Sequence, residues 1–384
     1  MRLVPTEEQN ELRSVLRSVF TKECPPELVR QWKTTGTDGA APAFPDSLWR
    51  ALTELGVLGM AIDEEFDGSG ATLNELGIVY SEAGRALCPS IVYSTLSFGI
   101  ALDRLAGPDL RKQYLPRVAG GDLRATVALW DAADAHDVRP KLTATRVDGG
   151  WTLSGVLPFV ENADLAELLL TTATATVFAE PDRVLGMLVS PGSEGWTSTR
   201  QPTIAGEHQC RVELDAVFVP DERVLTGTDE AGLALDEVRW VADVVTALQC
   251  MEMAGGGAEV LERTVDYVRT RHQFGRPIGS FQAVQHIVAD IHIAVEAARL
   301  SAASAVWWLA RGERAGRQVA IAKMHASEAY KWATLNAHQV HGGMGYVRET
   351  DLHLWSERAK VSEIRGGTAD VAARWLEEEI GLVG

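Results

Sequence analysis

The first 122 residues carry apolar side chains at the spacing of amphipathic helices. Thr6 and Gln9 stand three positions apart, as in a capping box that opens a helix. The apolar face that follows contains Leu12, Val15, Leu16 and Val19. The same period, interrupted by Pro and Gly, predicts a helix that Asp46 caps and further helices at Leu73–Ala86, Ser97–Leu105 and Pro108–Ala119. This part of the chain is therefore expected to be helical.

From about Leu123 the pattern changes to short segments that are rich in β-branched residues, which is typical of strands. Asp148-Gly149-Gly150 is a hairpin signal between two of these segments, because glycine allows a positive φ. The predicted strands are Arg124–Trp130, Leu142–Val147, Trp151–Val156, Leu168–Phe178, Val184–Val189 and Gln209–Val219. We expect a β domain inserted in an otherwise helical chain.

The helical period returns at about Leu233, now in long segments. These are Leu235–Thr270, Ser280–Arg311, Arg314–Val340 and Thr368–Ile380. Most of them exceed the usual helix length of globular proteins, which favours a bundle that packs against a partner subunit. The fold class is therefore α+β, with a helical domain at 1–122, a β domain at 123–230 and a helical bundle at 231–384. Strands and helices do not alternate, which argues against a Rossmann nucleotide site.

Charge and composition narrow the function. The chain of 384 residues has 53 acidic and 36 basic side chains, a net charge of −17. That charge disfavours a sequence-independent nucleic-acid binder, which needs a basic surface. No stretch of 18 residues is free of charge, so no membrane span is predicted. The start of the chain lacks a secretory pattern and the four cysteines are scattered, both of which suggest the cytoplasm.

Two segments carry most of the candidate chemistry. Arg269–His286 combines a helix end, a Gly/Pro turn and a new helix that Ser280 is expected to cap; an Arg at such a break suits a pyrophosphate. Gln339–Tyr346 places three glycines at a helix end, where the backbone can approach a flat or charged ligand. Taken alone, each also reads as an ordinary helix end.

Together with Glu363–Asp370, which contains Gly366-Gly367-Thr368, these segments resemble the acyl-CoA dehydrogenase family. Its flavoenzymes read Arg-x-x-Phe-Gly, then Gln-x-x-Gly-Gly-x-Gly-Tyr, then a short Gly-Thr segment, in this order. The likeness extends over essentially the whole chain. It implies a helical N-terminal domain, a central β-barrel-like domain and a C-terminal four-helix bundle.

The resemblance also implies that FAD lies between subunits of a homo- or hetero-oligomer. It assigns the FAD diphosphate and adenosine to Arg271 and Gln273, with Phe274 packing nearby and Gln282 as an additional contact. It assigns contacts with the FAD of a neighbouring subunit to Gln339 and Gly343. It places Gly367 and Thr368 at the diphosphate region.

The family's reaction is the α,β-dehydrogenation of an acyl-CoA thioester. A carboxylate removes the α proton while the β hydrogen leaves as hydride to the flavin, in a dry cleft that stabilises the enolate-like charge. The electrons then pass to an electron-transferring flavoprotein. This activity, too, is an expectation that rests on the resemblance.

The sequence departs from the family at the base. The usual Glu position before Gly-Thr is Gly366, and the alternative position on the first long C-terminal helix is Val245; neither side chain can accept a proton. The β domain also departs, since Ala128–Asp134 replaces a Thr-Glu-Pro-x-Ala-Gly-Ser-Asp stretch. Where the family has a Trp and a Thr beside the flavin, this chain has Phe159 and Glu161, and the Glu161 carboxylate would disfavour flavin reduction.

Three hypotheses follow. The chain is an active dehydrogenase with a displaced base, Asp370 or Glu252, although a solvated or paired carboxylate is the plainer interpretation of each. Alternatively, it is the non-catalytic partner in an α2β2 assembly, because the two glycines before Thr368 resemble those of the non-catalytic subunits. Some assemblies of this kind act on steroid side chains. In the third hypothesis, the fold serves another flavin oxidation or binds acyl-CoA without redox chemistry. We favour the second.

Two other patterns carry less information. His286, Asp290 and His292 offer no third ligand on one helix face, so no metal site is predicted. Gly255-Gly256-Gly257 resembles a dinucleotide loop but lies inside a helical pattern without a preceding strand. Close helix packing or a kink explains these glycines better.

Overall fold

The computed structural model of the chain describes residues 4–34, 44–175, 183–225 and 232–382. These residues form two compact units, each assembled from separate stretches of the chain. Unit 1 comprises Met1–Arg30, Leu73–Cys88 and Thr246–Gly384, and unit 2 comprises Gln31–Thr72 and Pro89–Val245. The division into domains at residues 122 and 230 remains a prediction.

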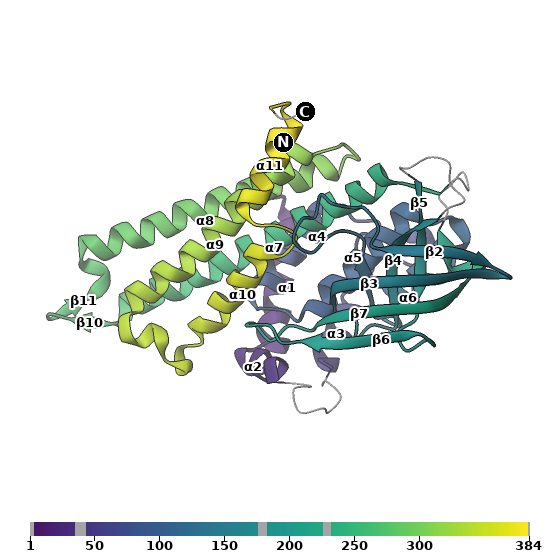
Figure 1. Cartoon of the computed structure of the whole chain (residues 1–384). Helices are drawn as coiled ribbons and strands as arrows, with labels where there is room; N and C mark the ends of the chain where they lie inside the picture. Colours follow the sequence, from purple (N-terminus) through teal and green to yellow (C-terminus); the bar gives the residue numbers. More distant parts are fainter. Residues whose placement is uncertain (1–3, 35–43, 176–182, 226–231, 383–384) are drawn as a thin grey trace. The chain divides into compact units, whose positions relative to one another are not determined.

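Unit 1 is built from helices, and α8 and α9 run side by side in it (Figure 1). Its first helix begins at the predicted capping box, where Gln9 N donates to Thr6 Oγ1 over 3.2 Å and Thr6 N donates to Gln9 Oε1 over 3.1 Å. The helices of this unit are α1 (Glu7–Glu23), the first part of α2 (Pro26–Thr34), α4 (Leu73–Arg85), α7 (Leu235–Thr270) from residue 246 on, α8 (Gln282–Leu309), α9 (Gly316–His341), α10 (Leu352–Ile364) and α11 (Ala369–Glu379).

The three consecutive glycines of α7 allow other elements to approach its backbone. A Cβ on Gly255 would lie 1.9 Å from the Ser81 carbonyl oxygen of α4, and one on Gly256 would lie 2.5 Å from the Tyr330 ring of α9. Gly84 has the reciprocal role, because its Cβ would lie 2.1 Å from the Glu252 carbonyl oxygen. The expectation of close helix packing at these glycines is therefore confirmed.

Unit 2 combines a nine-stranded mixed sheet with helices. The strand order is β6-β7-β3-β2-β4-β5-β8, with β1 paired in parallel to β4 and β9 paired to β5; the described strands leave this sheet open and close no barrel. The strands are β1 (Ala125–Ala128), β2 (Leu142–Val147), β3 (Gly150–Glu161), β4 (Leu168–Ala175), β5 (Arg183–Val189), β6 (Trp196–Gln201), β7 (Gln209–Pro220), β8 (Val224–Leu225) and β9 (Leu233–Ala234). The helices are α3 (Asp46–Glu54), α5 (Ser90–Leu105), α6 (Pro108–Ala119) and the first residues of α7.

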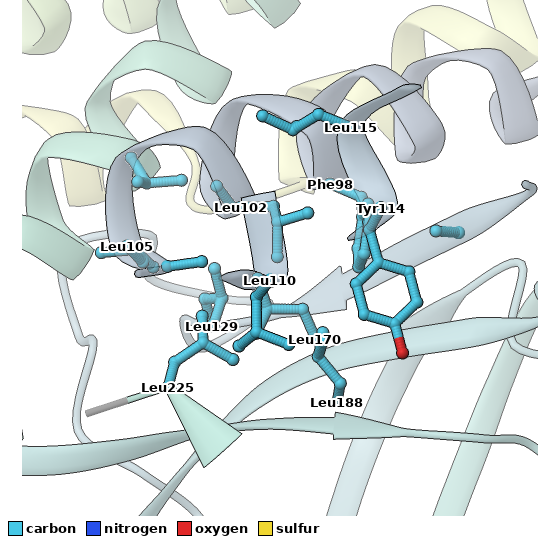
Figure 2. Close-up of a cluster of buried hydrophobic side chains, with 14 of the residues drawn as sticks. Phe98, Leu102, Leu105, Leu110, Tyr114, Leu115, Leu129, Leu170, Leu188 and Leu225 are labelled. Carbon is cyan, nitrogen blue, oxygen red and sulfur yellow. The ribbon is translucent and has the colours of Figure 1, made fainter. Parts of the chain in front are cut away.

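The core of unit 2 joins its helices to one part of the sheet. Phe98 and Leu102 of α5 and Leu115 of α6 belong to one buried cluster with Leu170 of β4 and Leu188 of β5 (Figure 2). All five side chains are fully or almost fully buried. Burial of this apolar surface, at about 25 cal/mol per Å², is the main force that holds these helices to the sheet.

Most predicted elements are present, and the differences have local reasons. The expected cap Ser280 donates its hydroxyl to the Pro277 carbonyl instead, and α8 begins after Phe281. Asp46 is already helical, and its N-cap Pro45 makes no side-chain bond. Residues 176–178 of the predicted strand Leu168–Phe178 lie outside the described residues.

The fold class is confirmed: helices, then a sheet, then helices follow one another along the chain. No helix in the described parts of the chain combines the length and apolar character that a membrane crossing requires.

Candidate functional site

The predicted pyrophosphate segment forms an exposed hairpin at the end of α7. β10 (His272–Gln273) pairs with β11 (Arg276–Pro277), and both turn residues between them have a positive φ, 51° at Phe274 and 79° at Gly275. The hairpin projects beyond the end of the α8–α9 pair (Figure 1). Its base is closed by the bond from Ile278 N to the Arg271 carbonyl, 2.8 Å long.

The hairpin and its base expose donors and an aromatic ring. Arg271 and Gln273 are exposed, and the Phe274 residue is 92% exposed. The Arg276 guanidinium lies 4.2 Å from the centroid of the Phe281 ring, which helps to order the strand that returns from the tip. The hairpin therefore presents a guanidinium, an amide and an apolar ring to whatever covers it.

The second predicted segment is a glycine turn after α9, at Gly342–Tyr346. The His341 ring stacks on Tyr267 of α7 with 4.2 Å between centroids, and Tyr267 Oη donates to the His341 carbonyl over 3.3 Å. Gly343 has no atom within 4 Å of an added Cβ. The helix end is thus held to α7, while the backbone at Gly343 stays accessible.

A second histidine supports the same turn. His338 Nε2 lies 2.6 Å from Ser356 Oγ of α10, and the ring stacks on Tyr346 at 5.1 Å. Burial lowers the pKa of both His338 and His341, so both rings are neutral at pH 7. Gln339 lies between them on the exposed side of the helix.

The third segment is the turn Gly366–Thr368 between α10 and α11. Gly366 and Gly367 both have a positive φ, 66° and 120°. A Cβ on Gly367 would lie 2.9 Å from Val371 Cγ1, so the turn packs closely against α11. Thr368 caps this helix by accepting from Val371 N over 3.4 Å. The turn therefore leads directly into a helix N-terminus, which favours anions.

The two carboxylates considered as displaced bases have different surroundings. Glu252 is 2% exposed; its Oε1 accepts from Arg358 Nη1 over 3.0 Å, and its Oε2 lies 3.7 Å from Arg365 Nη1. Asp370 is exposed in the first turn of α11. Val245, the alternative base position, is 2% exposed in the apolar core of unit 2.

The end of β3 presents the predicted flavin neighbours of unit 2. Phe159 and Glu161 are two positions apart on this strand, Phe159 lies where the register with β7 shifts, and it is 49% exposed. The backbone there is fixed, because Thr126 Oγ1 donates to the Glu161 carbonyl over 2.6 Å. Asn162 is fully buried and bonds to the hydroxyls of Ser90 and Ser94.

The comparison with known proteins decides the family. A model of the acyl-CoA dehydrogenase C-terminal domain matches residues 242–381, and a model of the N-terminal domain matches residues 6–122. The chain belongs to the acyl-CoA dehydrogenase family. It is 29% identical over 380 residues to the acyl-CoA dehydrogenase IpdE2 of Mycobacterium tuberculosis (strain ATCC 25618 / H37Rv), covering 98% of this chain and 99% of that one.

Two solved structures have a similar fold. The ChsE4-ChsE5 complex from Mycobacterium tuberculosis matches with a TM-score of 0.87 and 27% identity, over 100% of both chains. A variant of the Tcur3481-Tcur3483 steroid ACAD matches with a TM-score of 0.84 and 29% identity, over 98% of both chains. The resemblance inferred from the three motifs is thus confirmed.

All three acyl-CoA dehydrogenase motifs of the C-terminal half lie in unit 1. The hairpin follows α7, the glycine turn follows α9, and Gly366–Thr368 follows α10. Gln282 is exposed at the first position of α8, beyond the hairpin. Which of these residues contact a ligand stays a prediction.

Sequence reasoning missed two buried groups in this acyl-CoA dehydrogenase fold. In unit 2, His136 Nε2 lies 3.1 Å from Asp243 Oδ1, and Arg239 Nη1 donates to the His136 carbonyl over 2.7 Å. This pair fastens the loop after β1 to α7. In unit 1, Lys323 is 1% exposed inside α9. A lysine within the apolar face of a long helix was the available signal for it.

The histidines of α8 show no metal geometry. His286, Asp290 and His292 are all exposed. Across the described ranges, no group of three or more His, Cys, Asp or Glu residues is placed to hold a metal ion.

Proposed function

We propose that this chain is the partner subunit of a heteromeric acyl-CoA dehydrogenase, in which it completes the FAD site of a catalytic sister and removes no proton from the substrate. The observation that carries this proposal is that both base positions, Gly366 and Val245, lack a carboxylate. A general base contributes about 10²–10⁴-fold in rate, so its loss removes most of the turnover.

The neighbouring carboxylates are poor replacements. Glu252 is buried and paired with Arg358, so a proton taken up there would break an internal ion pair. Asp370 is exposed to water on the first turn of α11, whereas α-proton abstraction needs a dry site. Both observations favour the partner role over a displaced base.

The residues of this chain fit FAD in three places. Arg271 and Gln273 are exposed donors on the hairpin, which suit a diphosphate and adenosine. Gly343 leaves space for a ring or phosphate to approach its backbone. Thr368 caps the N-terminus of α11, where an anion is stabilised. When bound, FAD supplies the acceptor for the substrate's β hydride.

We expect the residues of this chain to serve two FAD molecules, its own and that of the neighbouring subunit. Arg271, Gln273, Gly367 and Thr368 would bind and orient one FAD, with Gln282 as a further contact from α8. Gln339 and Gly343 would reach the FAD of the neighbouring subunit, whose own Glu accepts the α proton. Phe159 would cover a flavin ring, while Glu161 would disfavour reduction of a flavin beside it. This chain's contribution is binding and exclusion of water rather than proton transfer.

We expect the substrate to be an acyl-CoA with a bulky acyl group, such as a steroid side chain. The support is the similarity to the ChsE4-ChsE5 complex and to the Tcur3481-Tcur3483 steroid ACAD, each of which is named as an assembly of two proteins. An electron-transferring flavoprotein would accept the electrons, and we expect the assembly to act in the cytoplasm.

The first test compares the lone chain with the assembled one. We expect the purified chain alone to hold little flavin and to oxidise no acyl-CoA, and co-expression with a homologue that carries the Glu to give full flavin absorbance and turnover. Full flavin loading and turnover by the lone chain would eliminate the partner role. Binding of acyl-CoA without flavin bleaching in every combination would instead favour a non-redox function.

A second test targets the shared FAD site without unfolding the chain. Gly343→Val introduces a side chain where no atom lies within 4 Å and where φ is not positive. The variant should keep its melting temperature but lower the flavin content and turnover of the complex. Gly107→Val is the matched control, because Gly107, the N-cap of α6, has the same open space and a φ of −68°. Unchanged flavin content in both variants contradicts the shared site.

A further inference from the structure

Lys323 is a cation in the interior of unit 1. It lies in the middle of α9, 1% exposed, and is among the largest fully buried side chains described. An ammonium group in such a position needs hydrogen-bond partners, because burial disfavours the charged form. Nζ of Lys323 donates to the Ser362 carbonyl over 2.9 Å and to the Arg365 carbonyl over 2.8 Å.

These two carbonyls belong to the end of α10. The last four carbonyls of a helix have no partner within it and require another donor. Ser362 is in the last turn and Arg365 is the C-cap, so Lys323 caps this helix from a neighbouring one. The carbonyl of Arg365 also belongs to the peptide that joins it to Gly366. Lys323 thereby holds the first peptide of the Gly366–Thr368 turn.

The same turn is held from two other helices. The Arg365 side chain lies 3.7 Å from Glu252 of α7, and Glu252 also pairs with Arg358 of α10. A Cβ on Gly367 would lie 3.2 Å from Trp375 of α11, which is 2% exposed. With Lys323 on α9, three helices surround the turn, and of these contacts Lys323 is the one that bonds directly to its backbone.

We infer that Lys323 is the positioning residue of the Gly366–Thr368 turn: by bonding the Arg365 carbonyl it orients the turn toward the FAD diphosphate and places a positive charge behind it. This inference rests on the proposed function, which assigns the diphosphate to Gly367 and Thr368. It also gives Glu252 a role as a structural anchor for Arg365 rather than as a base.

The charge of Lys323 depends on pH in an accessible range. Burial lowers its pKa from 10.5 to about 8, so the ammonium is charged at pH 7 and largely neutral at pH 9. The titratable groups that act on it are Cys250 and Glu252 of α7, Glu363 of α10, and Arg365. Burial raises the pKa of Cys250 to about 12, so this thiol stays neutral over that range.

The test compares Lys323→Met with Lys331→Met. Lys331 also joins α9 to α10, donating to Glu363 Oε1 over 2.8 Å, but it does not contact the turn. In the FAD-free chain, amide hydrogens of residues 366–368 should exchange about tenfold faster in Lys323→Met and be unchanged in Lys331→Met, as expected when the turn loses the buried hydrogen bond to the Arg365 carbonyl. Equal exchange in both variants overturns the inference.

FAD affinity of the complex with its sister supplies the second readout. We expect Lys323→Met to weaken FAD binding about tenfold or more, measured by flavin fluorescence, and Lys331→Met to leave it unchanged. In the unmodified complex, affinity should fall as pH rises through 8, and Lys323→Met should lack this inflection. A general loss of stability would lower affinity without removing the inflection, so an inflection that persists contradicts the inference.

A more conservative variant covers the case in which Lys323→Met does not fold. Lys323→Gln keeps an N–H donor without the charge, so it should retain part of the exchange protection and lose the pH inflection. Retention of both properties overturns the inference. If the unmodified complex binds no FAD, the proposed function fails, while the exchange experiment still decides whether Lys323 holds the turn.

Discussion

The hairpin at 272–277 and the turn at 366–368 are both predicted to contact FAD, yet they differ in how the chain supports them. The hairpin tip is exposed: Phe274 is 92% exposed with a positive φ. The contacts of the hairpin are made within it and to residues next to it in the sequence, such as Arg271, Ser280 and Phe281. Gly366 and Gly367 of the turn are buried, and α7, α9 and α11 surround them.

The difference indicates which parts of the proposed FAD site are ordered in one chain without its partner subunit. The turn is pre-organised by its own unit, so binding there loses little conformational entropy. The hairpin carries a large apolar ring in water, and such a group at a protruding tip marks an interaction site. We therefore expect the turn to be ordered in the lone chain and the hairpin to acquire its full environment from a ligand and a neighbouring subunit.

The largest expected effect concerns the ion pair beneath the turn. Glu252→Ala leaves the Arg358 guanidinium, 5% exposed, without its carboxylate and should cost about 3–5 kcal/mol of unfolding free energy in urea titrations. Glu262→Ala is the control, because Glu262 also pairs with an arginine, Arg85, but is 59% exposed; it should cost about 1 kcal/mol or less. Similar losses of unfolding free energy in the two variants would mean that the buried ion pair of Glu252 stabilises the fold no more than an exposed one.

The next effect is the pH dependence that Lys323 confers. Its pKa is about 8 in the folded chain and near 10.5 when unfolded. Between these values the unfolded state binds more protons, so the unfolding free energy of the natural chain should rise with pH relative to Lys323→Met. The gain should reach up to about 3 kcal/mol by pH 10.5, measured by urea titration at several pH values. If the difference in unfolding free energy between the two chains does not change with pH, the lowered pKa of the buried Lys323 is contradicted.

A smaller effect compares glycines in the two regions. Gly367→Ala forces a side chain onto a φ of 120° and within 2.9 Å of Val371, and should cost about 1–3 kcal/mol. Gly275→Ala, at a φ of 79° with no atom within 4 Å, should cost about 1 kcal/mol and act only on the hairpin. Thermal melts and amide exchange of residues 272–277 separate the two outcomes. If Gly275→Ala lowers the stability of the whole chain more than Gly367→Ala does, the hairpin is more tightly supported than the turn, which contradicts our comparison.

The smallest expected effect on stability belongs to the hairpin tip. Phe274→Ala should change the unfolding free energy by less than about 0.5 kcal/mol, because the side chain is almost fully exposed. It should nevertheless weaken FAD loading or assembly with the sister about tenfold, seen by flavin absorbance and sedimentation. Val15→Ala, at an exposed apolar site on α1, should change neither property. An equal effect of the two variants on assembly would remove the hairpin from the interface.

Sequence patterns predicted the long and regular elements best. The bounds of α7, α6 and β2 agree with the expectation, because each has a repeated apolar period or clear breakers at its ends. Strand β6 was missed, since its residues are mainly exposed and polar and leave no alternation to detect. Helix α10 was missed because its buried face includes Arg358 and Glu363, which look like surface residues.

The candidate site divides in a similar way. The order of helices and strands, the three motifs and the lack of a carboxylate at Gly366 and Val245 are properties of the covalent chain, and the sequence by itself determined them. Only the tertiary structure decided that Glu252 faces Arg358, 106 residues away, and that Lys323 caps the carbonyl of Arg365, 42 residues away. Such pairings arise where helices pack and charges leave water together, and no local period encodes which distant partner a buried charge will meet.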